Sequence, residues 1–395
     1  MNVTITPTQL RGSVIPPSSK SQAHRAVLAL ALSGGEGKLS NLSMSQDIQA
    51  TKDCVAALKS GTPAGMDGLP MLDCRESGST LRFLIPVALA LRGGGCFTGR
   101  GRLMERPQAP YFDIFREKGI FWERIGNLLE VKGTLTPGEY RLRGDVSSQF
   151  VTGLLYALPL LGGDSEIVLT SPLESRDYVA MTLDVLEKFG VRVENQNYAR
   201  FLVPGKQKFQ ARDMTIETDW SQAGFWYAAK LLGSPLDVGG MDPGSVQGDR
   251  VIAAHYEMLA QPGDVEIDVS DCPDLVPPLA AMAALRAGHT TRLTNAARLR
   301  LKESDRLAAV TQVLSALGAD VAEGPDFLTV CGKASLTGGV TVDSFSDHRI
   351  AMMAAIAATR CVKPVTVTGA ECVAKSYPNF WDEYESLGGK IQKSG

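Results

Sequence analysis

The chain alternates short polar segments with apolar segments of about ten residues, and this alternation occurs six times. In each copy a polar head rich in Ser, Asp, Lys or Arg precedes the apolar segment, which ends at Gly or another small residue and leads into β-branched residues. The apolar segments carry few charges on any side, so they predict helices that are buried on all faces. The heads begin near residues 18, 76, 146, 220, 272 and 345.

Most copies are followed by a second, more amphipathic segment that ends at a glycine, such as YVAMTLDVLEKFGVRVEN or DRLAAVTQVLSALGADVAEG. A glycine at this place is typical of a helix C-terminus. Each repeat is therefore predicted as helix, strand, helix, strands. Heads that lie just over fifty to just over seventy residues apart are too distant for a solenoid and favour compact α/β domains. Three repeats fall before about residue 218 and three after it, which predicts two similar halves; one doubly wound sheet with extra hairpins is the alternative.

Composition narrows the class of protein. The chain has 395 residues, 44% hydrophobic and 21% charged, as expected of a globular protein with a large core. Its formal net charge of -3 argues against binding to nucleic acid or to an anionic membrane. The start, MNVTITPTQL, alternates like a strand, and the longest apolar run, near IAMMAAIAA, is about half of a membrane span. We therefore expect a cytoplasmic protein.

Cysteine and histidine give no metal or disulfide pattern. The seven cysteines include no CxxC pair, and the four histidines form neither HxxxH nor HExxH. An odd number of scattered cysteines is typical of reduced, structural thiols. We expect no metal and no cofactor.

Residues suited to anion binding gather in the heads, because helix N-termini present unpaired N–H groups and the positive end of the helix dipole. The first head, SSKSQAHRA, contains Lys20, Ser21 and Arg25. The alternative is that Ser18 or Ser19 caps a helix while the basic side chains are solvated. The later heads of the first half, together with the loop GRGRLMERPQAP, add Gly78, Arg106, Ser147, Ser148, Gln149, Ser175 and Tyr178.

The second half carries acids as well as bases. Asp274 lies in CPDLVPP, the segment RLRLKESDRL groups Lys302, Glu303 and Arg306, and SFSDHRIAMM and VAKSYP add Asp347, His348, Arg349 and Lys375. Each segment alone resembles a capped, charged helix start on a surface. Together, fixed cations that suit several anionic groups and two carboxylates that can transfer protons indicate group transfer between two small anionic metabolites without a cofactor.

With these residues in place, the chain resembles the 5-enolpyruvylshikimate-3-phosphate synthase family of enolpyruvyl transferases. The resemblance covers essentially the whole chain. It rests on SSKSQAHRA, ESGSTLR, MERP, SSQF, QGD, PDLVPP, LKESDR, SDHR and AKSYP, which occur in this order.

The resemblance implies two inverse α/β barrel domains, each of three βαβαββ repeats with buried helices and strands outside. One domain, residues 1–19 plus 219–395, would carry acid and base residues and phosphoenolpyruvate-binding residues. The other, residues 20–218, would carry most residues that bind shikimate 3-phosphate. The active site would lie in the cleft between the domains, and the N-terminal strand would belong to the C-terminal domain.

The resemblance also assigns the ligand-binding residues. The shikimate 3-phosphate site would comprise Lys20, Ser21, Arg25, Ser147, Ser148, Gln149, Ser175, Tyr178, Asp274 and Lys302. The phosphoenolpyruvate site would comprise Lys20, Gly78, Arg106, Gln149, Arg306, His348, Arg349 and Lys375. Neither site implies a metal, a cofactor, a nucleic acid or a membrane, and we expect a monomer that glyphosate can inhibit.

The implied reaction is addition followed by elimination: the methylene carbon of phosphoenolpyruvate is protonated, the 5-hydroxyl attacks C2, and phosphate leaves a tetrahedral intermediate. The catalytic residues would be Asp274 as base, with Glu303 and Lys20 handling the other proton. Glu76, Phe83 and Arg298 depart from the family's common residues, which bears on affinity and on the response to glyphosate.

Three alternatives remain within related folds. A UDP-N-acetylglucosamine enolpyruvyl transferase would use a loop cysteine closely followed by Arg-Pro. Here Arg106 follows Cys96 only after ten residues, and Cys96 lies in a strand-like stretch. Cys96 is therefore interpreted as structural. An RNA 3′-phosphate cyclase would need a nucleotide-linked histidine and a more basic face. A non-catalytic binding protein would be expected to lose Lys20, Asp274 or Glu303 first.

Overall fold

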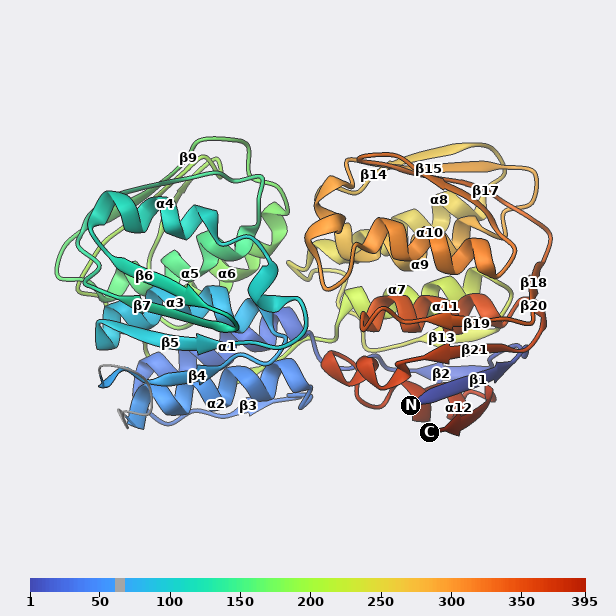
Figure 1. Ribbon diagram of the computed structural model, residues 1–395, viewed down its shortest axis with the longest axis horizontal. Coiled ribbons are helices and arrows are strands. Elements are labelled where there is room, and N and C mark those ends of the chain that lie inside the picture. The colour runs from blue at the N-terminus through green and yellow to red at the C-terminus, as the bar shows by residue number, and fades with distance from the viewer. Residues whose placement is uncertain (61–67) are drawn as a thin grey trace. The chain divides into compact units, whose positions relative to one another are not determined.

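The computed structural model describes residues 1–60 and 68–395 and divides into two compact units, each of which mixes helices and strands (Figure 1). Unit 1 comprises Met1–Ser19 and Glu217–Gly395, and unit 2 comprises Lys20–Ile216. The resemblance implied chain crossings near residues 19 and 218. The predicted α/β class, with two similar halves, is confirmed.

Unit 2 contains the elements of the first three repeats. In chain order they are α1 (Lys20–Ser33), β3 (Leu39–Ser40), α2 (Gln46–Ser60), β4 (Met71–Asp73), α3 (Gly78–Arg92), β5 (Gly94–Thr98), α4 (Ala109–Lys118), β6 (Phe121–Ile125), β7 (Leu128–Lys132), β8 (Gly138–Leu142), α5 (Ser148–Ala157), β9 (Ser165–Leu169), α6 (Arg176–Lys188), β10 (Glu194–Gln196), β11 (Arg200–Val203) and β12 (Met214–Thr215).

Unit 1 contains the first strands of the chain and the last three repeats. Its elements are β1 (Asn2–Thr6), β2 (Gly12–Val14), α7 (Trp220–Leu231), β13 (Leu236–Val238), α8 (Ile252–Ala260), β14 (Val265–Asp268), α9 (Val276–Ala283), β15 (Thr290–Thr294), α10 (Arg306–Ala316), β16 (Asp320–Glu323), β17 (Leu328–Cys331), β18 (Leu336–Gly338), β19 (Thr341–Asp343), α11 (His348–Ala358), β20 (Cys361–Lys363), β21 (Val365–Thr368), α12 (Phe380–Ser386) and β22 (Lys390–Ser394).

The same sheet order recurs in both units. The sheets β4-β5-β7-β6 and β8-β9-β11-β10 of unit 2 and β14-β15-β17-β16 of unit 1 each join a parallel pair, connected through a helix, to an antiparallel hairpin. The last sheet, β19-β21-β1-β22, has the same plan, but the chain's first strand takes the place next to β21. Within the described residues, the repeats that begin with α1 and α7 show only the parallel pairs β12-β3 and β13-β2, so they are shorter than the expected βαβαββ repeat.

The first helix of each repeat forms the core, as its apolar pattern predicted. Every residue of α9 and α11 is buried, and α3 is buried along most of its length. In Figure 1 the strands β5, β7 and β6 run side by side across one side of unit 2. Burial on all faces explains why these helices have so few charged residues. None of the helices in the described part of the chain has both the length and the apolar character required to cross a lipid bilayer.

Close packing aligns the N-termini of α3 and α5. Pro86 inside α3 has no N–H to bond the carbonyl of Arg82, and the Tyr111 hydroxyl donates to that carbonyl instead, at 2.7 Å. Gly153 of α5 makes room for this contact, because a Cβ there would lie 2.2 Å from the Tyr111 hydroxyl oxygen and 2.4 Å from the Arg82 carbonyl oxygen. The polar heads of the second and third repeats are thereby held on neighbouring helices.

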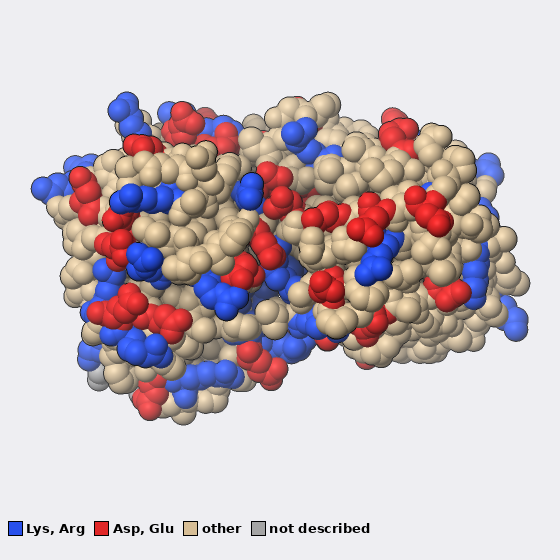
Figure 2. Space-filling model, turned by 90° about the horizontal axis from the view of Figure 1, so that it is seen from above, with Lys and Arg blue, Asp and Glu red and all other residues tan. Residues whose placement is uncertain are grey.

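Charged side chains of both signs are mixed over the molecular face in Figure 2, in keeping with the small net charge. All seven cysteines are free thiols, and all except Cys331 are buried. Cys96 lies in β5 and is fully buried, as expected of a structural thiol.

Candidate active site

The polar centre of unit 1 is Arg306, the first residue of α10, whose side chain is only 1% exposed. Its guanidinium binds three carboxylates: Nε donates to Asp347 at 2.9 Å, Nη1 to Asp274 at 2.9 Å and Nη2 to Glu303 at 2.6 Å. Burial acts to lower the pKa of Arg306, but Asp347, Glu303 and Asp274 outweigh it and raise that pKa. Arg306 is therefore a permanent cation that orders the acidic side chains around it.

Helix caps hold this cluster in place. Asp305 caps α10 by accepting from the N–H of Ala308 at 3.2 Å. Asp347, which is fully buried, caps α11 by accepting from the N–H of Arg349 at 3.0 Å and also accepts from the Ser304 hydroxyl at 3.0 Å. The caps expected from SDHR and KESDR are thus present, and the same residues also belong to the buried ion cluster.

Asp274 follows Pro273 in the short 3-10 helix before α9 and is surrounded by cations. Its Oδ1 accepts from Arg306 and, at 3.4 Å, from Lys302, and its Oδ2 accepts from Arg349 at 3.0 Å. Burial lowers the pKa of Lys302, while Asp274 opposes that effect. Two arginines and a lysine thus hold Asp274 as an anion, the form that a general base requires.

Asp249 was not predicted as a site residue, although it lies in the QGD motif. Its side chain is 5% exposed. Burial and the negative charge of Asp274 raise the pKa of Asp249 to about 7, against the opposing effect of Arg349. Asp249 is therefore a further carboxyl group near this cluster, and its pKa is raised toward neutral pH.

Two further predicted residues lie in unit 1. Lys375 ends a 3-10 helix (Ala370–Lys375), is 5% exposed, and donates from Nζ to the carbonyl of Ser346 at 2.6 Å. His348 begins α11 and is 2% exposed, with Nδ1 4.0 Å from Asp347 Oδ1. Arg298, one of the departures from the family pattern, donates to the carbonyl of Ser270.

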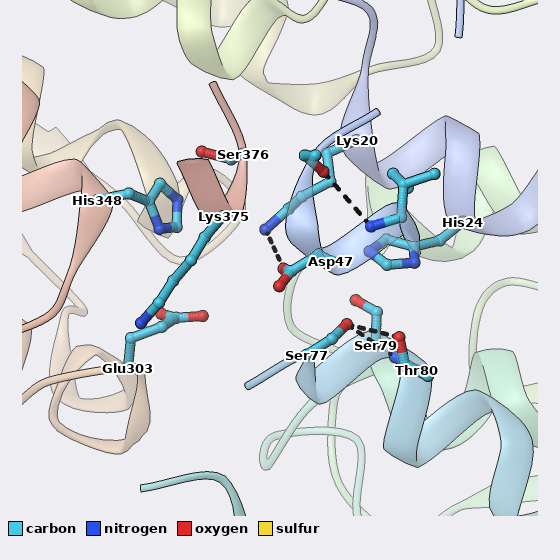
Figure 3. A network of polar contacts seen from close by, with 12 residues as sticks. Lys20, His24, Asp47, Ser77, Ser79, Thr80, Glu303, His348, Lys375 and Ser376 are labelled. Carbon is cyan, nitrogen blue, oxygen red and sulfur yellow. Dashed lines mark hydrogen bonds and ion pairs between the residues drawn. The ribbon is translucent and has the colours of Figure 1, made fainter. Parts of the chain in front are cut away.

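In unit 2, Lys20 begins α1 and its Nζ lies 2.8 Å from Oδ2 of Asp47, in the first turn of α2 (Figure 3). The two side chains are 15% and 11% exposed, so water screens this pair less than a surface ion pair. The alternative in which Lys20 is solvated is therefore wrong. Asp47 was not predicted, because its own segment shows only an ordinary amphipathic pattern.

Arg25 is also buried rather than solvated, at 2% exposure. Nε donates to the Thr182 hydroxyl at 2.8 Å, Nη1 to the carbonyl of Ser21 at 2.7 Å and Nη2 to the carbonyl of Tyr178 at 2.9 Å. Burial lowers the pKa of Arg25 to about 10, so the side chain is still charged at neutral pH. It joins α1 to α6. Its guanidinium carbon also lies 5.2 Å from the centre of the buried Phe83 ring, which connects it to α3.

Gln149 connects the heads of α3 and α5. Its Nε2 donates to the Ser79 hydroxyl at 3.0 Å, and its Oε1 accepts from Arg82 Nη1 at 2.7 Å. Ser147 caps α5 by accepting from the N–H of Gln149 at 3.3 Å. Ser148, Gln149 and Ser147 therefore lie at one helix N-terminus next to another, where N–H groups favour an anion.

Two predicted residues lie at the start of α6. Ser175 is buried and adopts a left-handed conformation, with φ of 55°, directly before the helix. Tyr178 follows in the first turn, and its N–H donates to the carbonyl of Ser175 at 3.1 Å. Because Tyr178 also accepts from Arg25 through its carbonyl, this turn is fixed against α1.

Arg106 packs directly over Gly78. A Cβ added to Gly78 would lie 2.7 Å from Arg106 Nη1, so only glycine leaves room for the guanidinium here. Arg106 is 9% exposed, whereas Arg100 and Arg102, the other arginines of this loop, are mostly exposed and pair with surface carboxylates. Of the three arginines, Arg106 is the one built into unit 2.

Each unit thus gathers its own predicted residues. Unit 1 brings together, through ion pairs within one cluster, Asp274, Lys302, Glu303, Arg306, Asp347 and Arg349. Unit 2 holds Lys20, Ser21, Arg25, Gly78, Arg106, Ser147, Ser148, Gln149, Ser175 and Tyr178 at or near the N-termini of α1, α3, α5 and α6. Among the described residues, no group of three His, Cys, Asp or Glu side chains has the arrangement of a metal site.

Known proteins match along the whole chain. The sequence model of EPSP synthase (3-phosphoshikimate 1-carboxyvinyltransferase) matches residues 5–384. Proteins named 3-phosphoshikimate 1-carboxyvinyltransferase from Clostridium kluyveri and Clostridium novyi are 45% and 42% identical, covering 99% of this chain and 98% of each relative. Homologues of this similarity share both fold and family.

Solved structures show the same fold at lower identity. The EPSP synthase of Acinetobacter baumannii is 22% identical with a TM-score of 0.78, covering 99% of this chain and all of that one. The enolpyruvyl transferase NikO from Streptomyces tendae is 16% identical with a TM-score of 0.76, covering 99% of this chain and 98% of that one. These similarities confirm the predicted fold class.

Proposed function

The chain belongs to the EPSP synthase family, and we propose that residues of both units act together on its two substrates. The chain is an enzyme that transfers the enolpyruvyl group of phosphoenolpyruvate to the 5-hydroxyl of shikimate 3-phosphate and releases phosphate. The observation that carries our assignment of residues is the buried cluster in which Arg306, Arg349 and Lys302 surround the carboxylate of Asp274.

Asp274 is the base at the 5-hydroxyl. It removes the hydroxyl proton while the oxygen bonds to C2 of phosphoenolpyruvate, and Glu303 with Lys20 delivers a proton to the methylene carbon. In the elimination step that carbon returns a proton to Glu303 and Lys20, the bond from C2 to the phosphate oxygen breaks, and phosphate leaves with the proton that Asp274 took from the hydroxyl. Protons and charges balance over the two steps with side chains alone.

Phosphoenolpyruvate carries a carboxylate and a phosphate, and the cations of the cluster fit these groups. We assign it to Lys20, Gly78, Arg106 and Gln149 of unit 2 and to Arg306, His348, Arg349 and Lys375 of unit 1. Arg306, Arg349 and Arg106 supply planar donors that suit a carboxylate or phosphate. Cations held in place before the reaction stabilise the charge that develops on the leaving phosphate.

Shikimate 3-phosphate needs an anion site and hydroxyl partners. We assign its phosphate and ring to Lys20, Ser21, Arg25, Ser147, Ser148, Gln149, Ser175, Tyr178, Asp274 and Lys302. The capped start of α5 supports the phosphate assignment, because unpaired N–H groups at a helix N-terminus favour an anion. Since Arg25 already donates to four protein groups, its main contribution there is positive charge.

The test is phosphate release by the purified protein with both substrates. We expect phosphate only when shikimate 3-phosphate and phosphoenolpyruvate are both present. No release with both substrates would contradict the proposal. Turnover with UDP-N-acetylglucosamine in place of shikimate 3-phosphate would favour the sister transferase, which the buried position of Cys96 does not support.

Replacing Gly78 with Ala should weaken phosphoenolpyruvate binding without unfolding the protein. The new Cβ would meet Arg106 Nη1 at 2.7 Å, at the end of a flexible side chain, so the guanidinium moves aside. Losing one charge-assisted contact should raise KM for phosphoenolpyruvate roughly tenfold, with a smaller change for shikimate 3-phosphate. Gly162→Ala is the control, because no atom lies within 4 Å of its added Cβ. An unchanged KM in Gly78→Ala would remove Arg106 from this site.

We also propose a cellular location and an oligomeric state for the protein. We assign it to the cytoplasm as a monomer, where it meets small-molecule substrates. Glyphosate carries a carboxylate and a phosphonate, so the cations assigned to phosphoenolpyruvate are expected to bind it as well.

A further inference from the structure

Two bridges, one helical turn apart, join α1 to α2. The first is the ion pair between Lys20 and Asp47 (Figure 3), and the second is a hydrogen bond of 2.7 Å between His24 Nδ1 and the Thr51 hydroxyl. Both partners of the second bridge lie four residues after their counterparts in the first, so they occupy the same helix faces. The second bridge is fully buried, since His24 and Thr51 are 0% and 1% exposed.

The second bridge continues to the start of α3. The Thr51 hydroxyl lies 2.7 Å from the hydroxyl of Thr80, which donates to the Ser77 hydroxyl oxygen at 2.7 Å. Ser77 caps α3 by accepting from the N–H of Thr80 at 3.2 Å and directly precedes Gly78. A buried line of polar groups thus runs from the helix that begins with Lys20 to the head that holds Arg106.

Each hydroxyl has one proton to donate, and this determines the donor in each hydrogen bond of the line. Because the Thr80 hydroxyl donates to Ser77, the Thr51 hydroxyl is the donor in its 2.7 Å bond to Thr80, with a longer contact of 3.4 Å to the carbonyl of Asp47. His24 then donates from Nδ1 to Thr51. His24 is neutral, since burial lowers its pKa well below the ordinary value and the Lys20 and Arg25 cations lower it further. A neutral imidazole with its proton on Nδ1 therefore supplies the donor for the bond to the Thr51 hydroxyl.

We propose that His24 and Thr51 are positioning residues that hold the Lys20–Asp47 pair in the geometry needed for turnover. Within the proposed function, Lys20 contacts both substrates and handles a proton, so a displacement of its Nζ by even 1 Å would be costly. Neither positioning residue has the exposure needed to touch a substrate. Their effect is on the alignment of α1, α2 and the start of α3.

Three variants test this role. Thr51→Val keeps the side-chain shape but removes the hydroxyl, His24→Leu removes the donor, and His24→Asn keeps an N–H donor near the position of Nδ1. We expect Thr51→Val and His24→Leu to lower kcat about 10-fold to 100-fold, with each KM within about threefold of wild type. His24→Asn should recover kcat to within about threefold of wild type, and the double variant Thr51→Val/His24→Leu should be no slower than the slower single variant.

A second readout follows Lys20 itself. Mass spectrometry of protein labelled briefly with an amine-reactive anhydride measures the reactivity of each lysine, and labelling at Lys20 should rise at least about threefold in Thr51→Val as its pairing with Asp47 loosens. Thr311→Val is the control, because that hydroxyl donates to the carbonyl of Leu307 within its own helix, α10. It should change neither kcat nor labelling.

The possible results distinguish the positioning role of His24 and Thr51 from the proposed function. Unchanged kcat and unchanged Lys20 labelling in Thr51→Val and His24→Leu, measured where all variants are folded, would overturn the positioning role even if stability falls. Loss of kcat in His24→Asn equal to that in His24→Leu would also overturn it. A wild-type protein without turnover would contradict the proposed function alone, and the labelling of Lys20 would still test the two bridges.

Discussion

Replacing Asp274 with Asn should lower the rate of phosphate release by about 10²-fold to 10⁴-fold, the usual contribution of a positioned general base. The amide keeps nearly the same shape, its one oxygen can still accept from Arg306, and Arg349 keeps its bond to the backbone carbonyl of residue 274, so the fold of the cluster should persist. It lacks the negative charge and the basic oxygen that a proton acceptor needs. Steady-state phosphate release at saturating substrates measures this loss.

The affinity of Asp274→Asn for phosphoenolpyruvate should not fall with its turnover. Asp274 lies within 3.4 Å of cationic groups on Arg306, Lys302 and Arg349 and competes with an incoming anion for their donors. Asp274→Asn removes that competitor, so phosphoenolpyruvate should bind at least as tightly as it does to the wild-type protein. Equilibrium titration of phosphoenolpyruvate in the presence of shikimate 3-phosphate measures this separately from turnover.

Asp382→Asn provides the control, since Asp382 is 73% exposed and pairs only with a surface lysine. Its turnover should stay within about twofold of wild type, as expected for an exposed ion pair. If Asp274→Asn turns over at a similar rate, Asp274 is not the base. A parallel loss of affinity for both ligands would instead give it a binding role.

The buried helices were predictable from sequence because nearly all of their residues are apolar. Segments such as IAMMAAIAA have no polar face to present to water, so a soluble chain must cover them on all sides. The repeated order of strands and helices followed from the breaks between these segments. The place of β1 did not, because Val3 pairs with Val367, and no local pattern records a partner so distant in the chain.

The site was only partly predictable, for a similar reason. Lys20 and Arg306 stood out because a charged residue directly before an apolar segment is unusual. Asp47 and Thr51 lie in an amphipathic helix whose sequence pattern gives no sign of a functional role. Only tertiary packing reveals that they face α1. Arg25 could not be placed from sequence either, because the pattern left it as an anion-binding candidate or a solvated side chain, and only the structure shows that α6 supplies Thr182 as its partner.

Replacing Arg306 with Gln should lower the free energy of unfolding by about 3–5 kcal/mol, the usual cost of removing one partner from a buried ion cluster. Arg306 is 1% exposed and bonds Asp274, Glu303 and Asp347, the last of which is fully buried. A glutamine amide can donate to two of these carboxylates at most and carries no charge, so the repulsion among the three is no longer offset. Chemical denaturation followed by tryptophan fluorescence measures the loss.

Lysine at this position should recover part of the stability but little of the activity. Arg306→Lys restores the charge, yet an ammonium cannot donate along three fixed directions to three carboxylates as the planar guanidinium does. We expect the unfolding midpoint to return most of the way toward wild type while KM for phosphoenolpyruvate remains raised at least about tenfold, because one bidentate contact is lost. Lys393→Gln is the control, since Lys393 also lies between two carboxylates in unit 1 but is 38% exposed.

The pH dependence of Arg306→Gln distinguishes charge from packing. Without the guanidinium, the folded protein holds carboxylates that lack a cation, and protonating them removes the repulsion. The deficit in unfolding free energy relative to wild type should therefore be largest at neutral pH and shrink as the pH is lowered toward 4. A deficit that stays constant over this range would show that Arg306 stabilises unit 1 by filling space, and the ion cluster would then contribute to the reaction without supporting the fold.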